Sequence, residues 1–243
     1  GEPGGPPLKP GNSVADINAG ILAATGILAA YAHRLKTGQG QVVDTSLMEA
    51  ALQQTYWHAA IYFATGQSPG PTGSSHILAA PYQAFRTADR THNNAGANHA
   101  NSERIADELG HPEWKTDTRF ATNTGRMTNR AALVEAMTAV LATRGNAHWI
   151  AAFDAAGVPV GPVHSIGEAL EHPQAQARGM VVEVEHAEAG RTRALGCPLH
   201  FSATPTVEPR AAPALGQHSR EVLQEFGYGD DEIDELITAG AVA

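Results

Sequence analysis

Residues 14–35 constrain the fold of this chain more than any other stretch, because their pattern is that of one long amphipathic helix. Apolar side chains recur at steps of three and four from Val14 to Tyr31, which places them along one face of a helix. Small residues around Gly20 and Gly26 make another side of this helix thin. Because each interior glycine costs about 1 kcal/mol relative to alanine, we expect another helix or strand to approach this thin side closely.

Both ends of this helix carry capping signals. Ser13 stands at the N-cap position and Asp16 follows three residues later, the spacing of a capping box near the positive end of the helix dipole. At the other end, Gly38 can adopt the left-handed conformation that ends a helix. We therefore interpret Asp16 as a capping residue and not as a nucleophile or base.

The next part of the chain has the signals of a strand, a second helix and a hairpin. Ser46 and Glu49 form another Ser-x-x-Glu box, which opens a helix. In chain order we expect a buried strand over residues 41–45, a helix from 46 to about 64, a loop over 66–75, and hairpin strands over 80–87 and 91–97.

Helices dominate the middle of the chain, and strands return near its end. The expected N-caps are Asn101 or Ser102, Thr128 or Asn129, Asn146, Ser219, and Asp230 or Asp231. The expected core residues are Trp114, Phe120, Leu133, Met137, Val140, Leu141, Trp149, Ile150 and Phe153. Residues 158–163 should be extended, 166–170 helical, 180–184 and 192–195 a hairpin, and 202–215 without regular structure.

Composition and charge limit the classes of function. With 42% hydrophobic residues and a formal charge of −9, the chain should be globular and should not bind nucleic acid or an anionic membrane. The longest apolar run, residues 20–32, is shorter than the roughly 20 residues that cross a bilayer, so we expect no membrane span. The single cysteine, Cys197, fits a reducing cytoplasm, and its apolar context favours a buried, inert thiol.

Motifs for metals and for common cofactors are absent from the sequence. The twelve histidines include no pair at i and i+4 and no Cys/His cluster with zinc spacing, so no metal is expected. No Gly-x-Ser-x-Gly, P-loop or Gly-x-Gly-x-x-Gly motif is present. The residues by themselves indicate an α/β or α+β domain.

Two short segments are candidates for a functional site. Gly73, Ser74, Ser75 and His76 form a loop with a possible acid or base, and the alternative is a solvated linker. Asn98 and His99 follow a predicted strand, where site residues are often found, and the alternative is that they only cap the next helix.

A series of nine motifs resembles the family III CoA-transferases, which include formyl-CoA and carnitine CoA-transferases and α-methylacyl-CoA racemase. These motifs follow the family's order. They read VADINAG, LKTGQGQVVDTSLMEA, APYQAFRTAD, HPEWKTDTRF with the later NR, GVPVGPV, HPQAQARGM, FSATP and APALGQHSREVLQEFGY.

The resemblance implies a fold with a large domain, an inserted small domain, and two subunits that interlock as a dimer. On this basis residues 1–56 belong to the large domain, 57–161 form the small domain, and 162–243 return to the large domain. The subunit partner would be a second copy or a complementary N-terminal chain, and neither nucleic acid nor membrane is expected.

The resemblance also implies chemistry on coenzyme A and acyl-CoA, with a carboxylic acid as the second substrate. In the family the catalytic aspartate precedes the VADINAG motif, so its counterpart is expected outside this chain, together with most of the CoA site. A glycine-rich family loop that closes over the intermediate aligns with residues 73–78, where serine, histidine and isoleucine replace glycines.

Two alternatives to CoA transfer remain open. One is an epimerase of the racemase type, which needs a carboxylate after a Gly-Ala pair, whereas this chain has Asn98 and His99 after Gly96 and Ala97. The other is a non-catalytic subunit that needs a partner chain carrying the aspartate.

Overall fold

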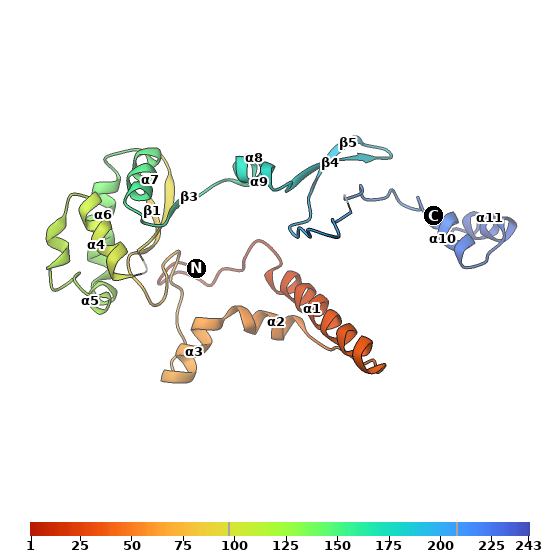
Figure 1. Ribbon diagram of the computed structural model, residues 1–243, viewed down its shortest axis with the longest axis horizontal. Helices are drawn as coiled ribbons and strands as arrows, with labels where there is room; N and C mark the ends of the chain where they lie inside the picture. Colours follow the sequence, from red (N-terminus) through yellow and green to blue (C-terminus); the bar gives the residue numbers. More distant parts are fainter. Residues whose placement is uncertain (97, 208) are drawn as a thin grey trace. The chain divides into compact units, whose positions relative to one another are not determined.

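The computed structural model describes residues 1–96, 98–207 and 209–243, which form two compact units, Gly1–Val163 and His164–Ala243 (Figure 1). Ala97 and Glu208, which lie in the segments 91–97 and 202–215 considered above, are outside the described residues.

The first long helix of the first unit is α1, Val14–Thr37, and it confirms the strongest sequence prediction. Gly38 ends it in the left-handed conformation with φ 77°, and its N–H donates to the Arg34 carbonyl oxygen at 2.8 Å. The expected capping box at the other end is not formed, because the Ser13 side chain makes no capping hydrogen bond. Ser13 does occupy the N-cap position, but the predicted capping box with Asp16 was wrong because its hydrogen bond is not formed.

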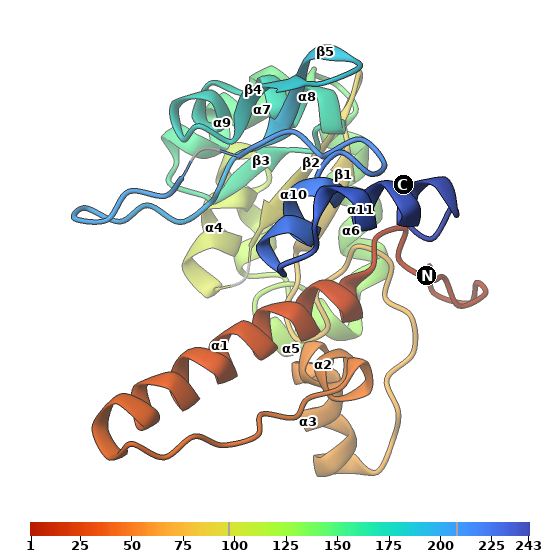
Figure 2. The same cartoon turned by 90° about the vertical axis from the view of Figure 1, so that its right-hand side faces the viewer.

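Residues 39–46 run back along α1, as Figure 2 shows, but they are not the predicted strand. A strand needs a partner for its backbone groups, and no described strand pairs with these residues. A helix or strand was expected to approach the thin side of α1 closely; at Gly26 the approaching residue is Val43 of this irregular segment, and a Cβ atom would lie 2.7 Å from its Cγ1. At Gly20 nothing lies within 4 Å.

Two helices, α2 at Leu47–Gln54 and α3 at Tyr56–Thr65, replace the single helix expected there. Ser46 caps α2 as predicted, since its side chain accepts a hydrogen bond from the Glu49 N–H. The break occurs at Thr55, whose hydroxyl and N–H both donate to the Leu52 carbonyl oxygen. This tighter, three-residue turn ends the regular α-helical bonding.

Most of the apolar surface of these three helices is exposed. Neither α1 nor α3 has a buried residue, and α2 buries only Ala50. Ile21 and Leu28 on the apolar face of α1 are 58% and 68% exposed. The amphipathic pattern was therefore correct, but the surface that would cover its apolar face is not within this unit.

Helix α1, with 24 residues, is also long and apolar enough to cross a membrane by length and composition. The uninterrupted apolar run of residues 20–32 is shorter than this helix, so the expectation of no membrane-spanning segment is corrected for α1. Core helices of globular proteins pass the same test when they are buried, so this property alone does not identify a membrane span.

A three-stranded antiparallel sheet forms the centre of the first unit, in the order β1-β2-β3. The predicted hairpin is present as β1, Tyr82–Arg86, and β2, Thr91–Ala95, in a register that pairs Tyr82 with Ala95. The predicted extended segment supplies β3, Val160–Pro162, which pairs with β2.

Helices α6 and α7 pack on this sheet, and α4 packs on α7 and on η1. The elements after the hairpin are α4 at His99–Glu108, the 3-10 helix η1 at Pro112–Lys115, α5 at Asn123–Thr128, α6 at Arg130–Leu141 and α7 at Asn146–Ala155. Two predicted caps were wrong by a few residues: Asn98 caps α4, and Gly145 precedes α7. Such shifts arise because several neighbouring residues have similar capping preferences.

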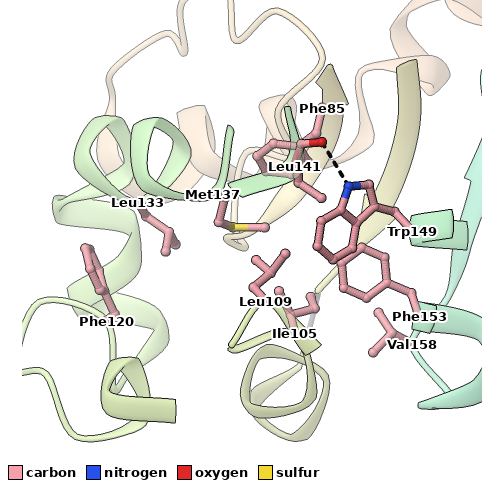
Figure 3. Packing of buried hydrophobic residues seen from close by; sticks show 10 residues of the cluster. All are labelled: Phe85, Ile105, Leu109, Phe120, Leu133, Met137, Leu141, Trp149, Phe153 and Val158. Atoms are coloured by element: carbon pink, nitrogen blue, oxygen red, sulfur yellow. Dashed lines mark hydrogen bonds between the residues drawn. The ribbon is translucent and has the colours of Figure 1, made fainter. Parts of the chain in front are cut away.

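The core of the first unit is an apolar cluster between the sheet and these helices (Figure 3). Its members are Phe85, Ile105, Leu109, Phe120, Leu133, Met137, Leu141, Trp149, Phe153 and Val158. The Trp149 indole N–H donates to the Leu141 carbonyl oxygen at 2.9 Å, which joins α7 to the end of α6. The core prediction holds for most residues, but Val140 and Trp114 are only partly buried at its edge, and Ile150 is also only partly buried.

The described residues of the second unit form a hairpin and four short helices. They are α8 at Ile166–Glu171, α9 at Pro173–Ala177, β4 at Val181–His186, β5 at Gly190–Leu195, α10 at Ser219–Glu225 and α11 at Asp230–Thr238. The sequence predicted all of these except α9. The N-caps of the last two helices were predicted too late in the chain. His218 occupies the N-cap position of α10 and Gly229 that of α11, where Ser219 and Asp230 or Asp231 were expected. Cys197 is partly exposed, which corrects the expectation of a buried thiol.

A buried polar pair, His92 and Asn146, lies inside the first unit. His92 on β2 is fully buried, and its Nδ1 lies 3.0 Å from Asn146 Oδ1 on α7. Burial disfavours the charged imidazolium and lowers the pKa of His92 below its ordinary value, although the hydrogen bond to Asn146 opposes this shift.

We predict that His92 makes the first unit sensitive to acid. Below pH about 6.5 His92 is protonated in the unfolded chain but not to the same extent in the folded chain. As the pH falls, the free energy of unfolding should therefore fall by up to about 1.4 kcal/mol per pH unit. Urea unfolding followed by tryptophan fluorescence between pH 7 and pH 5 measures this slope. His92→Phe should flatten it, whereas His99→Gln, at an exposed site, should leave it unchanged. Equal slopes in all three proteins would contradict the assignment.

Candidate functional site

The two segments singled out from the sequence lie at the same end of the β1–β2 hairpin. The loop of residues 73–80 leads into β1 at Tyr82, while Gly96 and Asn98 follow β2, which ends at Ala95. Because Tyr82 and Ala95 are paired, the hairpin brings the two segments close at this end. A Cβ atom at Gly96 would lie 2.4 Å from the Pro81 carbonyl oxygen, so only glycine allows this approach.

The start of the loop is bound to β1 through its two serines. Ser74 Oγ accepts a hydrogen bond from the Ala84 N–H at 3.2 Å, and Ser75 Oγ donates to Gln83 Oε1 at 2.9 Å. Gly73 has φ 61°, and its N–H donates to the Gly1 carbonyl oxygen at 2.9 Å. The loop is therefore hydrogen-bonded to β1, while Gly73 and Ser74 are exposed to solvent, and both interpretations of the segment stay predictions.

Three polar residues from α5 and α6 fix the end of the loop. Asn123 donates to the Leu78 carbonyl oxygen at 3.0 Å and accepts from the Ala80 N–H at 3.3 Å. Arg126 Nε donates to the Ala80 carbonyl oxygen at 2.5 Å, and Arg130 Nη2 donates to the His76 carbonyl oxygen at 2.8 Å. Burial lowers the pKa of both arginines below that of a free guanidinium.

These anchoring residues were not identified from the sequence, although a signal was present. Asn123, Arg126 and Arg130 are spaced by three and four residues, so they share one face of the α5–α6 segment. Polar residues that share a face next to a core helix either face solvent or make hydrogen bonds inside the protein, so this pattern is compatible with buried hydrogen bonds. Their partners are backbone carbonyls some 50 residues earlier in the chain, and these could not be predicted from spacing.

Asn98 and His99 hold their side chains in local interactions. Asn98 Oδ1 accepts a hydrogen bond from the Asn101 N–H at 2.8 Å, which is its role as the cap of α4. His99 Nε2 lies 3.6 Å from Glu103 Oε1, one turn further along the same helix. Among the described residues, no hydrogen bond or ring contact joins either side chain to the loop of residues 73–76. Their proposed accessory role in catalysis stays a prediction.

We predict that Asn123→Ala loosens the loop without unfolding the core. Loss of both side-chain hydrogen bonds, each worth about 1 kcal/mol, should make amide hydrogen exchange at residues 76–80 about thirtyfold faster. Hydrogen exchange followed by mass spectrometry measures this effect, and Thr124→Ala, at an exposed position of the same helix, is the control. Unchanged exchange in Asn123→Ala would show that the two arginines hold the loop without it.

Comparisons with known proteins agree on one family. A sequence model described as CoA-transferase family III matches residues 1–219. Human succinyl-CoA:glutarate CoA-transferase is 30% identical over 243 residues, and acetyl-CoA:oxalate CoA-transferase from Acetobacter aceti is 32% identical over 228 residues. These alignments cover 100% and 93% of this chain, but only 56% and 57% of the two relatives.

The structure agrees with a solved member of the same group. A crystal structure of a CAIB/BAIF family protein from Brucella suis superposes with a TM-score of 0.76 and 31% identity, covering 93% of this chain and 58% of that chain. This chain therefore spans little more than half the length of the relatives it matches. With the family match over most of its residues, the chain belongs to CoA-transferase family III.

Proposed function

We propose that the protein that contains this chain transfers CoA between carboxylic acids. The observation that carries this proposal is the match to the family over residues 1–219, together with relatives named for CoA transfer to glutarate and to oxalate. The acid that this protein uses is not part of the proposal.

The chemistry proposed is covalent catalysis by a carboxylate that lies outside this chain. The carboxylate attacks the thioester carbonyl of acyl-CoA, the C–S bond breaks, and CoA leaves as a thiolate. The thiolate then attacks the enzyme carbonyl of the resulting anhydride and releases the first acid. A second acid enters by the reverse of these steps and leaves as the new acyl-CoA, so no oxidant or other reactant is needed.

In this proposal the loop of residues 73–78 covers the reacting groups. Its hydrogen bonds to β1 and to α5–α6 support this role, because a loop that keeps water away from a reactive anhydride has to be held in a defined position. The serines that replace the family's glycines make such bonds. The loop of this protein is therefore expected to move less than a glycine-rich one.

Epimerisation of the racemase type is less well supported. After Gly96 the chain has Ala97, Asn98 and His99, and none of these carries a carboxylate. Ala97 lies outside the described residues, and Asn98 is occupied as a helix cap. A non-catalytic subunit remains the alternative from another class, and it requires a partner chain that carries the aspartate.

We predict that this chain alone neither transfers CoA nor binds it more tightly than about 10 μM, which corresponds to roughly 7 kcal/mol. The assembled enzyme, which is this chain with the segment or partner that supplies the carboxylate, should transfer CoA from an acyl-CoA to a free acid. Chromatography of the CoA esters and calorimetry with CoA measure the two properties. Deuterium entering the α-carbon of a 2-methylacyl-CoA without any acceptor acid would favour the epimerase instead.

We further propose that the exposed apolar faces of α1 and α3 are covered by protein, either a second copy or a complementary chain. Leu28, Tyr56 and Phe63 are each more than half exposed, and large apolar side chains gathered on exposed faces are typical of a surface that a protein partner covers. The family match extends over α1, which supports a covered protein helix in preference to a membrane span.

We predict that this chain associates at micromolar concentration and that Leu28→Glu weakens the association by at least tenfold. A buried glutamate on the apolar face would lose its hydration without gaining a partner. Light scattering against concentration measures the mass, and His33→Glu, on the same helix, is the matched control. A stable monomer, or equal effects of both substitutions, would contradict a protein-covered apolar face.

A further inference from the structure

His76 is the most tightly held side chain of the candidate loop. Its imidazole stacks on the Tyr82 ring with centroids 5.0 Å apart and planes 5° apart, and its edge meets Trp57 at 6.3 Å. Its backbone N–H donates to the Tyr82 carbonyl oxygen at 2.8 Å, and its own carbonyl accepts from Arg130. Both the ring and the backbone of His76 are therefore fixed.

One hydrogen bond also decides which ring nitrogen carries the hydrogen. The Leu78 N–H lies 3.2 Å from His76 Nδ1, and a backbone N–H can only donate. Nδ1 is thus the acceptor and Nε2 carries the ring hydrogen. Among the described residues no group pairs with Nε2, and the side chain is only partly buried. The loop presents a single, oriented N–H donor with no protein partner.

The surroundings of this donor favour one kind of ligand atom. The aromatic rings of Trp57 and Tyr82 contact the imidazole that carries it, and the guanidinium of Arg130 is engaged with the His76 carbonyl and with Met127 Sδ. Glu2, another charged group of this region, packs against Gly73 at the start of the loop. A phosphate is usually bound by several cations or backbone N–H groups, whereas one carboxylate oxygen can be bound by one donor.

We propose that His76 Nε2–H binds the carboxylate of the acid substrate when the loop covers the site. This proposal rests on the proposed function, since it assigns one substrate of that reaction to one atom of this chain. His76 then contributes to the choice and orientation of the acid and not to the binding of CoA.

The experiment compares His76→Phe with His76→Gln in the assembled enzyme. Phenylalanine keeps an aromatic ring to stack on Tyr82 but has no donor, while the glutamine amide can place an N–H close to the position of Nε2. The same pair of substitutions at His58, an exposed position of α3, provides the matched control.

His76→Phe should raise the KM for the acid at least tenfold, the effect of losing one hydrogen bond to a charged group, with the KM for acyl-CoA changed by less than twofold. His76→Gln should stay within about threefold of the wild type for both substrates. A rise in the KM for acyl-CoA would place a CoA phosphate at His76 and overturn the proposal. Equal losses in both variants that follow a lowered Tm would also overturn it, because they indicate a structural role.

A binding measurement separates this inference from the proposed function. Calorimetric titration of the wild type and of His76→Phe with glutarate and with oxalate requires no turnover. If the wild type binds an acid and His76→Phe binds it at least tenfold more weakly, the inference stands even where no CoA transfer is found. Equal binding of the acids by the two proteins overturns the inference, whatever the activity of the wild type.

Discussion

The apolar cluster between the hairpin and helices α4, α6 and α7 is the interaction on which the first unit depends. Met137, Leu141 and Phe153 are fully buried at its centre, and the full burial of a side chain of this size stabilises by about 1.5–3 kcal/mol. The cluster fixes the hairpin relative to the helices. Because the loop of residues 73–80 is bound to β1 on one side and to α5–α6 on the other, its position follows from this packing.

A different physical situation holds for α1, α2 and α3. Their apolar residues contact few partners within the unit, and α1 packs mainly on α2 and on the returning segment at Val43. An isolated helix gains little stability from its sequence alone, since tertiary contacts supply most of it in proteins. Within this unit such contacts are few for α1 to α3, and the relatives are longer than this chain, which spans 56% and 58% of two of them.

The sequence allowed most elements to be predicted but few of the contacts between them. Helical periodicity located α1, α6 and α7, and strand alternation located both hairpins, because these signals are local. The strand expected at residues 41–45 was wrong for the opposite reason, as a strand depends on a partner that local pattern does not reveal. Thr55 divided a predicted helix in two through its own bonds to Leu52, a competition between side chain and backbone that periodicity does not detect.

Fewer features of the candidate site than of the fold could be predicted from the sequence. Glycine and serine content marked residues 73–76 as a loop, and the resemblance to the family gave that loop a role, but nothing in the sequence fixed the orientation of His76. That orientation depends on Tyr82, Leu78 and Arg130 together, which lie at separations of 6, 2 and 54 residues. Only the fold brings Tyr82 and Arg130 to this residue, where Tyr82 stacks on the imidazole and Arg130 donates to the His76 carbonyl oxygen.

Because the imidazole of His76 is already fixed in the folded chain, its conformational entropy is lost on folding and not on ligand binding. A side chain that must be immobilised when a ligand binds reduces the affinity by about 0.5–1.5 kcal/mol. In this chain His76 is ordered by folding, through bonds that exist without a substrate, so that cost does not fall on the binding step. The helices α1 and α3 differ in this respect, because their apolar side chains are largely exposed within the unit. The chain thus combines a preorganised donor with an exposed apolar surface, and under our proposal that surface is covered by protein.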